Sequence, residues 1–583
     1  MPDPQVVLTS ALAAAIDRAF GAGAAGADPV VRPVANSRFG DYQANGAMAL
    51  AKRLDMPARD VAEAIVAVAD LGGVCKAVEV APQGFVNLTL DDSWLAAQVA
   101  TLVGDDRLGV APASRPETVV VDYSSPNLAK EMHIGHLRST VIGDALARVL
   151  AFLGHRVIRQ NHVGDWGTQF GMLVEYLAET GWSADGDRRE ISDLNELYRE
   201  AQSRFESDPG FADRARLRVV ALQGGDPATL ALWRALVLES ERHFEAVYDR
   251  LGVLLTPEDV RGESFYNEQL SSVADELEST GVAVIDDGAL CVFPPGFLGR
   301  EGEPLPLIIR KSDGGFGYAA TDLAAVRYRL RTLEAKRLAY VVDARQSQHF
   351  AMVFAVARMA GWVGDGDRLE HVPFGTILGS DGRPYRTRSG DTVKLADVLD
   401  EAVERAAAIV AEKNPDLSPD EQAVVAAAVG IGAVKYADLS SDRVKDYVFD
   451  WDRMLSFDGN TAAYLQNAYV RIRSIFRRAE APTPSASEVP VIDLARPEER
   501  ALALALLRLS SVVEGTADAL APHKLCGYLF DLAQDFTAFY EHCPVVRAET
   551  EEIRRSRLVL CELTARVLSV GLGLLGIETV EQM

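Results

Sequence analysis

The sequence predicts an α/β protein with a Rossmann-like core, preceded by an α+β unit and followed by an all-α bundle. Strand and helix patterns alternate between residues 118 and 179, which is the order of a parallel, doubly wound sheet. Strand patterns return near residue 289, and the chain is almost entirely helical beyond about residue 390. Because 583 residues exceed what one core usually supports, we expect three or four structural units.

Residues 1–112 are the first expected unit. An apolar helix pattern lies near residues 5–20, and "NSRFGDYQANGAMALAKRL" reads as a turn that runs into a helix. "GFVNLTL" is a short strand pattern, and the Gly-, Pro- and Asp-containing stretch 104–117 is typical of a linker. These features predict a small α+β domain.

The second unit, residues 113–380, carries the expected Rossmann-type sheet. "TVVVDYSS" and "HRVIRQNHVG" are strand patterns, each followed by a helix pattern, "GHLRSTVIGDALARVLAFLG" and "WGTQFGMLVEYLAE". A charged, helical insertion is expected at about 182–285. The strands then resume with "ALCVF", "PLIIRKSD", "LAYVVDA" and "FGTIL", the last two enclosing the helix "SQHFAMVFAVARMAG".

Two further units complete the chain. Residues 381–454 are expected to form a loop followed by a helical stem, and residues 455–583 a helical bundle. Within the bundle, "APTPSASEVP" at 481–490 has the composition of a flexible loop.

Composition narrows the class of protein. A net charge of −25 argues against a non-specific nucleic-acid binder, although a specific RNA enzyme can still concentrate cations locally. The five cysteines form no CxxC pair, which argues against a disulfide framework and a thiolate zinc site. The N-terminal apolar stretch has no basic residue before it and is interrupted by Asp17 and Arg18. We therefore expect a cytoplasmic protein without a membrane span.

The segment His133-Ile134-Gly135-His136, called here the HIGH motif, follows the first predicted strand of the sheet and opens its helix. Two histidines in this position could be metal ligands, an acid/base pair or packing residues. A strand end beside a helix N-terminus is a ready phosphate site, and Gly135 allows a flat ring to approach the backbone. No nearby cluster supplies the further ligands that zinc needs, so ATP is the ligand we expect and no protein-bound metal is predicted. The HxGH pattern alone is shared by many nucleotidyl transferases.

The surrounding residues are more specific. "SSPNLAKEMHIGHLRST", "NHVGDWGTQFG", "GYAATDLAAV", "YVVDARQSQHF" and "DGRPYRTRSGDTVKLADVL" occur in this order, with "FGDYQANGAMALAK" and "GFVNL" before them and "AYVRIRSI" after them. This set resembles the class I aminoacyl-tRNA synthetases, specifically the arginyl-tRNA synthetases, over essentially the whole chain.

The resemblance implies a reaction and its partners. Domain by domain, it implies an N-terminal tRNA-binding domain, a class I catalytic core and a C-terminal anticodon-binding bundle. It implies that ATP, with Mg²⁺ on its phosphates, activates L-arginine as arginyl-adenylate. The arginyl group then passes to the 2′-OH of the terminal ribose of tRNA(Arg), which usually must be bound before activation begins. A monomer is usual in the family.

One loop departs from the common class I pattern. Where many class I enzymes carry the lysine-rich KMSKS sequence, this chain has Tyr385-Arg386-Thr387-Arg388-Ser389, without a lysine. Arg386 and Arg388 can supply charge with fork geometry rather than as a point charge. Lys130, just before the HIGH motif, is well placed to supply the missing ammonium, as is thought for the family. The catalytic candidates are therefore Lys130, His133, His136, Arg386 and Arg388.

The resemblance also assigns the amino-acid site. A guanidinium is planar, permanently charged and rich in donors, so its pocket needs carboxylates and other acceptors. Tyr318 and Asp322 are four residues apart and share one face if helical. These two residues, together with Asp122, Asn127 and Gln346, match arginine contacts in the family. Without the resemblance, an aspartate and a tyrosine at this spacing would more often form a surface pair.

Two segments are expected to contact tRNA. "YLQNAYVRIRSIFRRA" combines Tyr464 and Arg471 with three further arginines, a combination suited to splayed-out anticodon bases, although a solvated basic helix face has the same pattern. In "GFVNL", Phe85 and Asn87 match positions that read a base in the tRNA elbow in the family, while a core phenylalanine with a structural asparagine would show the same pattern. The alternatives for the whole chain are another HxGH nucleotidyl transferase and a catalytically inactive synthetase-like tRNA-binding protein.

Overall fold

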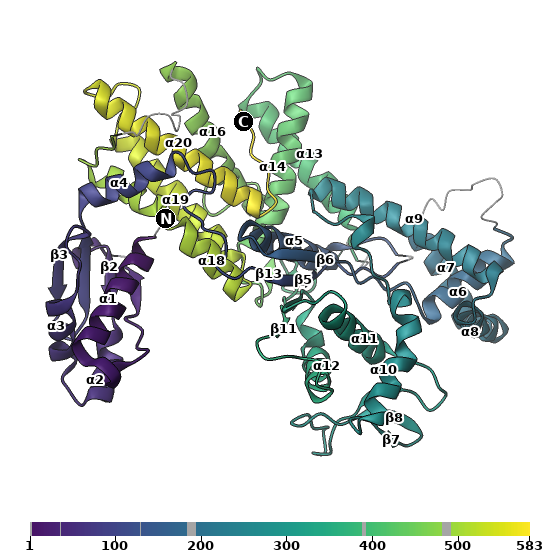
Figure 1. Ribbon diagram of the computed structural model, residues 1–583. Coiled ribbons are helices and arrows are strands. Elements are labelled where there is room, and N and C mark those ends of the chain that lie inside the picture. The colour runs from purple at the N-terminus through teal and green to yellow at the C-terminus, as the bar shows by residue number, and fades with distance from the viewer. Residues whose placement is uncertain (1–2, 35, 129, 183–193, 387–391, 481–490) are drawn as a thin grey trace.

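The computed structural model describes residues 3–34, 36–128, 130–182, 194–386, 392–480 and 491–583. The purple N-terminal unit and the blue-green insertion lie at opposite ends, with the parallel sheet and the yellow C-terminal helices between them (Figure 1). The expected α/β class with a C-terminal helical domain is confirmed.

The N-terminal unit is a four-stranded antiparallel sheet covered by helices. Its strand order is β1-β2-β4-β3. Along β4, Val86, Leu88 and Leu90 are buried, so their face of the sheet packs on the helices and residues 85, 87 and 89 lie on the other face. The elements are α1 (Pro4–Phe20), β1 (Val31–Pro33), β2 (Tyr42–Ala44), α2 (Gly46–Leu54), α3 (Ala58–Val68), β3 (Cys75–Val80), β4 (Val86–Leu90) and α4 (Asp92–Leu102).

The central sheet has four parallel strands in the order β11-β10-β5-β6. Strand order reverses between β5 and β10, because the chain passes from β5 to β6 on one side and returns to β10 on the other. This topological switch point is where open α/β sheets bind ligands, beyond the carboxyl ends of the strands. The elements are β5 (Thr118–Asp122), α5 (Ile134–Phe152), β6 (Arg156–Gln160), α6 (Thr168–Glu179), α11 (Tyr318–Arg331), β10 (Arg337–Tyr340), α12 (Ser347–Met359) and β11 (Arg368–His371).

Three strands expected in this sheet belong elsewhere. "ALCVF" and "PLIIRKSD" form β8 and β9 of a separate antiparallel sheet, β7-β8-β9, and "FGTIL" supplies β12, which pairs with β13. The hairpin between β7 and β8 turns at Asp287 and Gly288, whose φ angles are 45° and 79°. Two consecutive positive φ angles suit the tight hairpin turn that joins antiparallel strands, so this segment cannot serve a parallel crossover. The strands are β7 (Val284–Asp286), β8 (Ala289–Val292), β9 (Leu307–Arg310), β12 (Ile377–Leu378) and β13 (Tyr447–Val448).

The segment before this hairpin is helical. Helix α6 packs on α7, α8 and α9, and α10 packs on α11. Within this segment Glu175 of α6 pairs with Arg214 and Arg218 of α8 at 2.9 and 2.8 Å. The elements are α7 (Leu194–Ser207), α8 (Pro209–Gln223), α9 (Pro227–Leu251), the 3₁₀ turn η4 (Glu263–Tyr266) and α10 (Asn267–Ser279).

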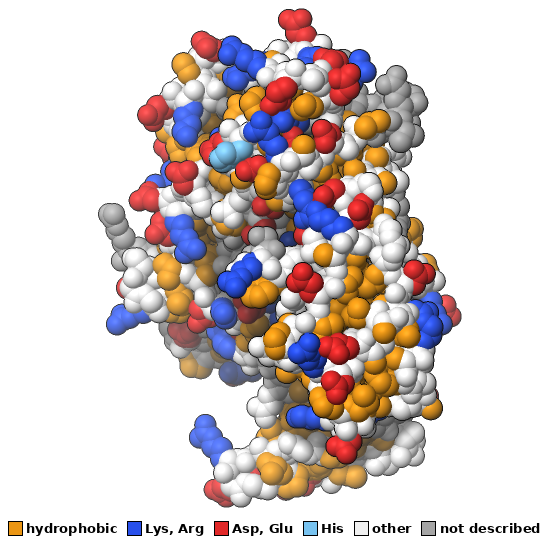
Figure 2. All heavy atoms as spheres, turned by 90° about the vertical axis from the view of Figure 1, so that its left-hand side faces the viewer, with side chains coloured by type: hydrophobic (Ala, Val, Ile, Leu, Met, Phe, Trp, Pro, Cys, Tyr) orange, Lys and Arg blue, Asp and Glu red, His pale blue; other side chains and the backbone are white. Residues whose placement is uncertain are grey.

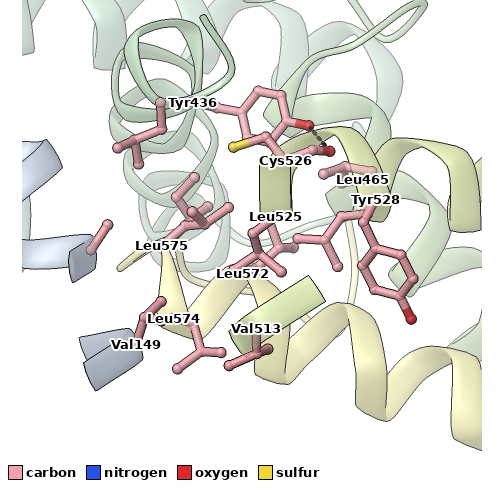
Figure 3. Close-up of a cluster of buried hydrophobic side chains, with 14 of the residues drawn as sticks. Val149, Tyr436, Leu465, Val513, Leu525, Cys526, Tyr528, Leu572, Leu574 and Leu575 are labelled. Carbon is pink, nitrogen blue, oxygen red and sulfur yellow. Dashed lines mark hydrogen bonds between the residues drawn. The ribbon is translucent and has the colours of Figure 1, made fainter. Parts of the chain in front are cut away.

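The C-terminal third is helical and shares its core with the sheet domain. Figure 3 shows Val149 of α5 in the same buried cluster as Leu572, Leu574 and Leu575 at the end of α20, with the Tyr436 hydroxyl donating to the carbonyl of Cys526 at 3.0 Å. All five cysteines are free, and four of them are buried. The helices are α13 (Leu395–Lys413), α14 (Pro419–Leu439), α15 (Trp451–Met454), α16 (Ala462–Ala479), α17 (Pro497–Leu506), α18 (Leu509–Ala519), α19 (His523–His542) and α20 (Glu551–Leu574).

Two described stretches are long and apolar enough to cross a membrane, by length and composition alone: Pro4–Ala24 and Pro419–Leu439. The second stretch is helix α14, and it is a core helix here, since about two thirds of its apolar part is buried against other helices. The first packs on α3 and β1.

Candidate functional site

A cleft of about 560 Å³ lies at the switch point between β5 and β10. It is bounded by the segment after β5, the first turn of α5, the segment after β10 and the loop after β12. The structure brings six of the predicted site residues to its wall: Asn127, His133, Gly135, His136, Gln346 and Arg386. Residues more than 250 positions apart in sequence therefore meet at one sheet edge.

The two histidines of the HIGH motif cap the helix that they open. Nδ1 of His133 accepts from the backbone N–H of Gly135 at 3.0 Å, and Nδ1 of His136 accepts from the backbone N–H of His133 at 3.1 Å. Because both Nδ1 atoms act as acceptors, the hydrogen-bond network assigns the proton of each neutral ring to Nε2. Each imidazole thus keeps one N–H that is not used in the cap.

Both rings are held neutral. Burial lowers the pKa of His136 to about 3, and the neighbouring His133 adds to the effect. Burial also lowers the pKa of His133, followed by the positive charge of Lys130. The histidines are therefore hydrogen-bond donors rather than cations at neutral pH.

Two glycines permit close approach at the cleft. A Cβ on Gly135 would stand 2.7 Å from Cε1 of His133, so a side chain here would push the imidazole out of its capping position. Gly164 lies on the loop that follows β6, and a Cβ there would stand 2.4 Å from Oδ1 of Asn127. Asn127 and Gly164 form a parallel bridge, which fixes the segment after β5.

The backbone after β5 is strained, and buried polar groups hold it. Ser124 and Ser125 have φ angles of 70° and 47°, a region that non-glycine residues seldom adopt. The hydroxyl of Ser124 bonds the Tyr248 hydroxyl at 2.7 Å, and the backbone N–H of Ser125 donates to Oδ1 of Asn161 at 2.9 Å. Tyr248 belongs to α9, so a helix of the insertion contacts the segment after β5 that lines the cleft.

Asp122 lies beneath the cleft rather than in its wall. Its carboxylate is buried and pairs with Nη2 of Arg329 on α11 at 2.7 Å. It also accepts from the hydroxyl of Ser125 at 3.1 Å, and Ser125 does line the cleft. Ser125 therefore joins Asp122 to the cleft wall, and the expected contact of Asp122 with a ligand stays a prediction.

Tyr318 and Asp322 begin α11, beside the cleft but outside its wall. Tyr318 is 74% exposed, while Asp322 is half-buried and contacts Nε2 of His349 at 2.6 Å. The hydrogen bond to the Asp322 carboxylate raises the pKa of His349, against the opposing effect of burial. His349 is three residues after Gln346 and lies on α12. The start of this helix therefore connects Gln346 at the cleft wall with Asp322 and Tyr318 on α11.

Glu263 completes an acidic group that the sequence interpretation missed. Burial raises the pKa of its carboxyl to about 8, with further contributions from Asp165 and Asp322. The phenol of the largely exposed Tyr318 loses part of its hydration against the neighbouring protein, which raises its pKa, and the negative charges of Glu263 and Asp322 add to the effect. Among the described residues, no hydrogen bond or ion pair engages the Glu263 carboxylate. A half-buried, unpaired carboxylate near a second one is a candidate site for a cation.

The segment that follows the second predicted motif, residues 393 and 394, contacts the HIGH segment. The backbone N–H of Ile134 donates to the carbonyl of Val393 at 3.0 Å, and Lys394 pairs with Glu131 at 2.7 Å. Arg386 lies at the wall of the cleft, and Arg388 falls outside the described residues. Lys130 is half-buried, with Nζ 4.0 Å from the ring centre of Tyr198.

The predicted RNA-contacting residues lie in the two outer domains. Phe85 and Asn87 occupy the face of β4 opposite the core, where Asn87 accepts from Gln43 at 2.8 Å. On α16, the Tyr464 hydroxyl bonds Thr537 at 3.2 Å, and the Arg471 guanidinium lies 5.5 Å from the ring centre of Tyr540.

The other arginines of α16 are partly engaged. Arg473 pairs with Glu581 at 3.1 Å, and Arg477 donates to the Glu581 carbonyl at 3.2 Å. Figure 2, which looks at the N-terminal and C-terminal units, shows basic and acidic side chains interspersed over this face. Among the described residues, no three His, Cys, Asp or Glu side chains gather as a metal site.

Three family profiles match the chain in succession. The "Arginyl tRNA synthetase N terminal domain" matches residues 7–90, "tRNA synthetases class I (R), catalytic domain" matches 98–451, and the "DALR anticodon binding domain" matches 465–583. The catalytic profile alone covers more than half of the chain.

Curated relatives and solved structures agree with these profiles. The chain is 54% identical to the arginine–tRNA ligase of Thermobifida fusca, covering 100% of both chains, and 51% identical to that of Shigella sonnei, covering 95% and 96%. The arginyl-tRNA synthetase of Plasmodium falciparum superposes with a TM-score of 0.87 at 31% identity, covering 100% of both chains. That of Thermus thermophilus gives 0.84 at 28% identity, covering 99% and 100%. With its cleft at the switch point and both flanking domains matched, the chain belongs to the arginine–tRNA ligases, the class I arginyl-tRNA synthetases.

Proposed function

We propose that this enzyme ligates L-arginine to tRNA(Arg) in two steps, through an arginyl-adenylate. The observation that carries the proposal is the pairing of two subsites at one sheet edge. Neutral Nε2–H donors and Arg386 surround the cleft, and a cluster of carboxylates lies beside it. Phosphate oxygens suit the first subsite and a guanidinium suits the second.

In the first step, an oxygen of the arginine carboxylate attacks the α-phosphorus of ATP, and the bond to the bridging oxygen of the leaving pyrophosphate breaks. No protein nucleophile is needed, so positioning and stabilisation of phosphate charge carry the catalysis. We assign the donors to His133, His136, Lys130 and the loop arginines, with Mg²⁺ carried by the ATP phosphates. In the second step, the 2′-OH of the terminal ribose attacks the arginyl carbonyl and AMP leaves.

The amino-acid subsite is proposed at Glu263, Asp322 and Tyr318. A guanidinium between the two carboxylates would offset the burial that raises the Glu263 pKa and the repulsion that adds to it, and it would share Asp322 with His349. Asn127 and Gln346 at the cleft wall then receive the ammonium and carboxylate end. Asp122 supports this end through Ser125 and Arg329.

For tRNA, we propose contacts at the outward face of β4 and along α16. Phe85 offers a ring and Asn87 an amide edge, both on the face of β4 away from the core. Tyr464 and Arg471 are assigned to the anticodon. We also retain as proposals the domain limits at residues 112, 380 and 454, a monomeric state, a cytoplasmic location and the need for bound tRNA before activation.

The test is arginine-dependent ATP–pyrophosphate exchange, measured with and without tRNA(Arg). Exchange that needs both arginine and the tRNA supports the proposal. Exchange with arginine alone contradicts the tRNA requirement only. Exchange that is insensitive to arginine favours another HxGH nucleotidyl transferase, and its complete absence favours a tRNA-binding relative without activity.

A further inference from the structure

Lys130 and Tyr198 join the HIGH segment to the helical insertion. Nζ of Lys130 lies 4.0 Å from the centre of the Tyr198 ring, well within the distance of a cation–π contact. Lys130 precedes His133 by three residues, and Tyr198 belongs to α7, the first described helix of the insertion. Both side chains are half-buried.

The aromatic ring is the contact that fixes the ammonium. Among the described residues, no hydrogen bond or ion pair engages Nζ of Lys130. The charge lies close to the HIGH motif, three residues before His133, and it helps to lower the pKa of both histidines, after burial in each case. A free lysine has a long, mobile chain, so a contact that holds it in one place removes much rotamer freedom before a ligand arrives.

The Tyr198 ring is fixed relative to the parallel sheet by the packing of its helix. Helix α7 packs on α6, which follows β6 directly. Between the two helices, the Tyr176 hydroxyl donates to Glu200 at 2.8 Å and Arg204 pairs with Glu179 at 3.3 Å. Tyr198 is therefore mounted on an element anchored to the same sheet as the HIGH motif.

We propose that Tyr198 is a positioning residue that holds the Lys130 ammonium beside the HIGH motif, ready for the phosphates of ATP. This inference rests on the proposed function and gives the insertion a part in the first step. A single cation–π contact is weak enough to be exchanged for a charge-assisted bond to phosphate when ATP binds. Tyr198 acts through Lys130 and touches no reacting atom itself.

The test measures tRNA-dependent exchange by two variants of Tyr198 and by a control variant of the same helix, with the concentrations of ATP and arginine varied separately. Tyr198→Leu removes the ring, and we expect kcat/KM for ATP to fall about two- to fivefold, the equivalent of a contact worth about 0.5–1 kcal/mol. The KM for arginine should not change. Tyr198→Phe keeps the ring face and should retain the wild-type value.

Phe205 supplies a matched control on the same helix. Its ring also faces a cation, with the Arg216 guanidinium carbon 5.6 Å from its centre, but it lies on the side of α7 that meets α8. Phe205→Leu should therefore disturb the insertion to a similar degree and leave kcat/KM for ATP unchanged. An equal loss in Phe205→Leu would mean that the effect is merely structural, and it would overturn the proposal.

A double-mutant cycle with Lys130→Ala decides whether Tyr198 acts through the lysine. If it does, Tyr198→Leu causes no further loss once the lysine is gone. The positioning role is overturned if the two substitutions lower kcat/KM for ATP independently, so that their factors multiply in the double variant. It is also overturned if Tyr198→Leu leaves kcat/KM for ATP unchanged or increases it. In both cases, exchange by the wild-type enzyme leaves the proposed function standing. If the wild-type enzyme shows no exchange, both proposals fall together.

Discussion

Arginine binding is expected to release a proton from Glu263. Burial, with Asp165 and Asp322 nearby, raises the pKa of this carboxyl to about 8, so it is mostly protonated at neutral pH in the free enzyme. A guanidinium has only donors and a fixed positive charge, so it binds the ionised carboxylate in preference. Arginine should therefore bind more tightly as the pH rises through this range.

The size of the effect follows from the ionised fraction. With a pKa of about 8, about 9% of the enzyme carries the ionised Glu263 at pH 7, which weakens the apparent affinity about elevenfold, or about 1.4 kcal/mol. Between about pH 6 and about pH 8 the ionised fraction rises about fiftyfold, and the dissociation constant should fall by the same factor. About 0.9 proton should leave per arginine bound at pH 7.

Isothermal titration calorimetry in buffers of different ionisation enthalpy measures this proton release directly. Glu263→Gln should remove most of it and flatten the pH dependence, and any remainder belongs to His349, which shares Asp322. Glu268→Gln, an exposed carboxylate on the following helix, should behave like the wild type. Proton release that is absent in the wild type, or that persists in full in Glu263→Gln, would refute the reasoning.

Three further outcomes follow from the described contacts. Asp322→Asn should raise the KM for arginine by more than about a hundredfold, the equivalent of about 3 kcal/mol for a cation left unpaired, and an unchanged KM would exclude the assignment. Asp438→Ala should lower the free energy of unfolding by about 3–5 kcal/mol, because it leaves the buried Arg138 guanidinium without its carboxylate partner. Urea denaturation measures this change, and a loss below about 1 kcal/mol would contradict the prediction. Because the pKa of folded His136 lies near 3, its neutral ring favours the folded state above the unfolded value of 6.5, and this stability is lost as the pH falls from there. The difference in unfolding free energy between wild type and His136→Asn should shrink by about 1.4 kcal/mol per pH unit below that value, and a constant difference would argue against the neutral ring.

What the sequence could predict was local. The HIGH motif sits between a strand and a helix that both have clear periodicity, so its place at a sheet edge follows from the chain around it. The convergence of Asn127 and Gln346 needs the strand order β5-β10, which no local pattern contains. It was reached only because the motifs resemble a known family.

What the sequence could not predict depends on distant partners. Asp122 is a predicted ligand contact, and its carboxylate also pairs with Arg329, more than 200 residues later, which no sequence pattern indicates. Glu263 stands at the end of a charged segment with no motif, and only the packing of η4 against Asp165 gives its carboxyl an unusual environment. The misplaced strands are different, because the "DDG" turn before "ALCVF" was a local hairpin signal.

Helix α5 shows why the reaction site and the C-terminal domain fold as one body. An amphipathic helix on an open sheet normally keeps a polar face in water, yet most of α5 is buried, including Arg138 and Asp144. Arg138 pairs with Asp438 of α14 at 3.2 Å, and α5 also packs on α13, α18 and α20. The polar face that the sequence displays is therefore turned toward helices some 300 residues later rather than toward solvent. Since the same helix begins with the two capping histidines, a shift of α14 relative to the sheet would strain a buried ion pair whose arginine also lines the cleft.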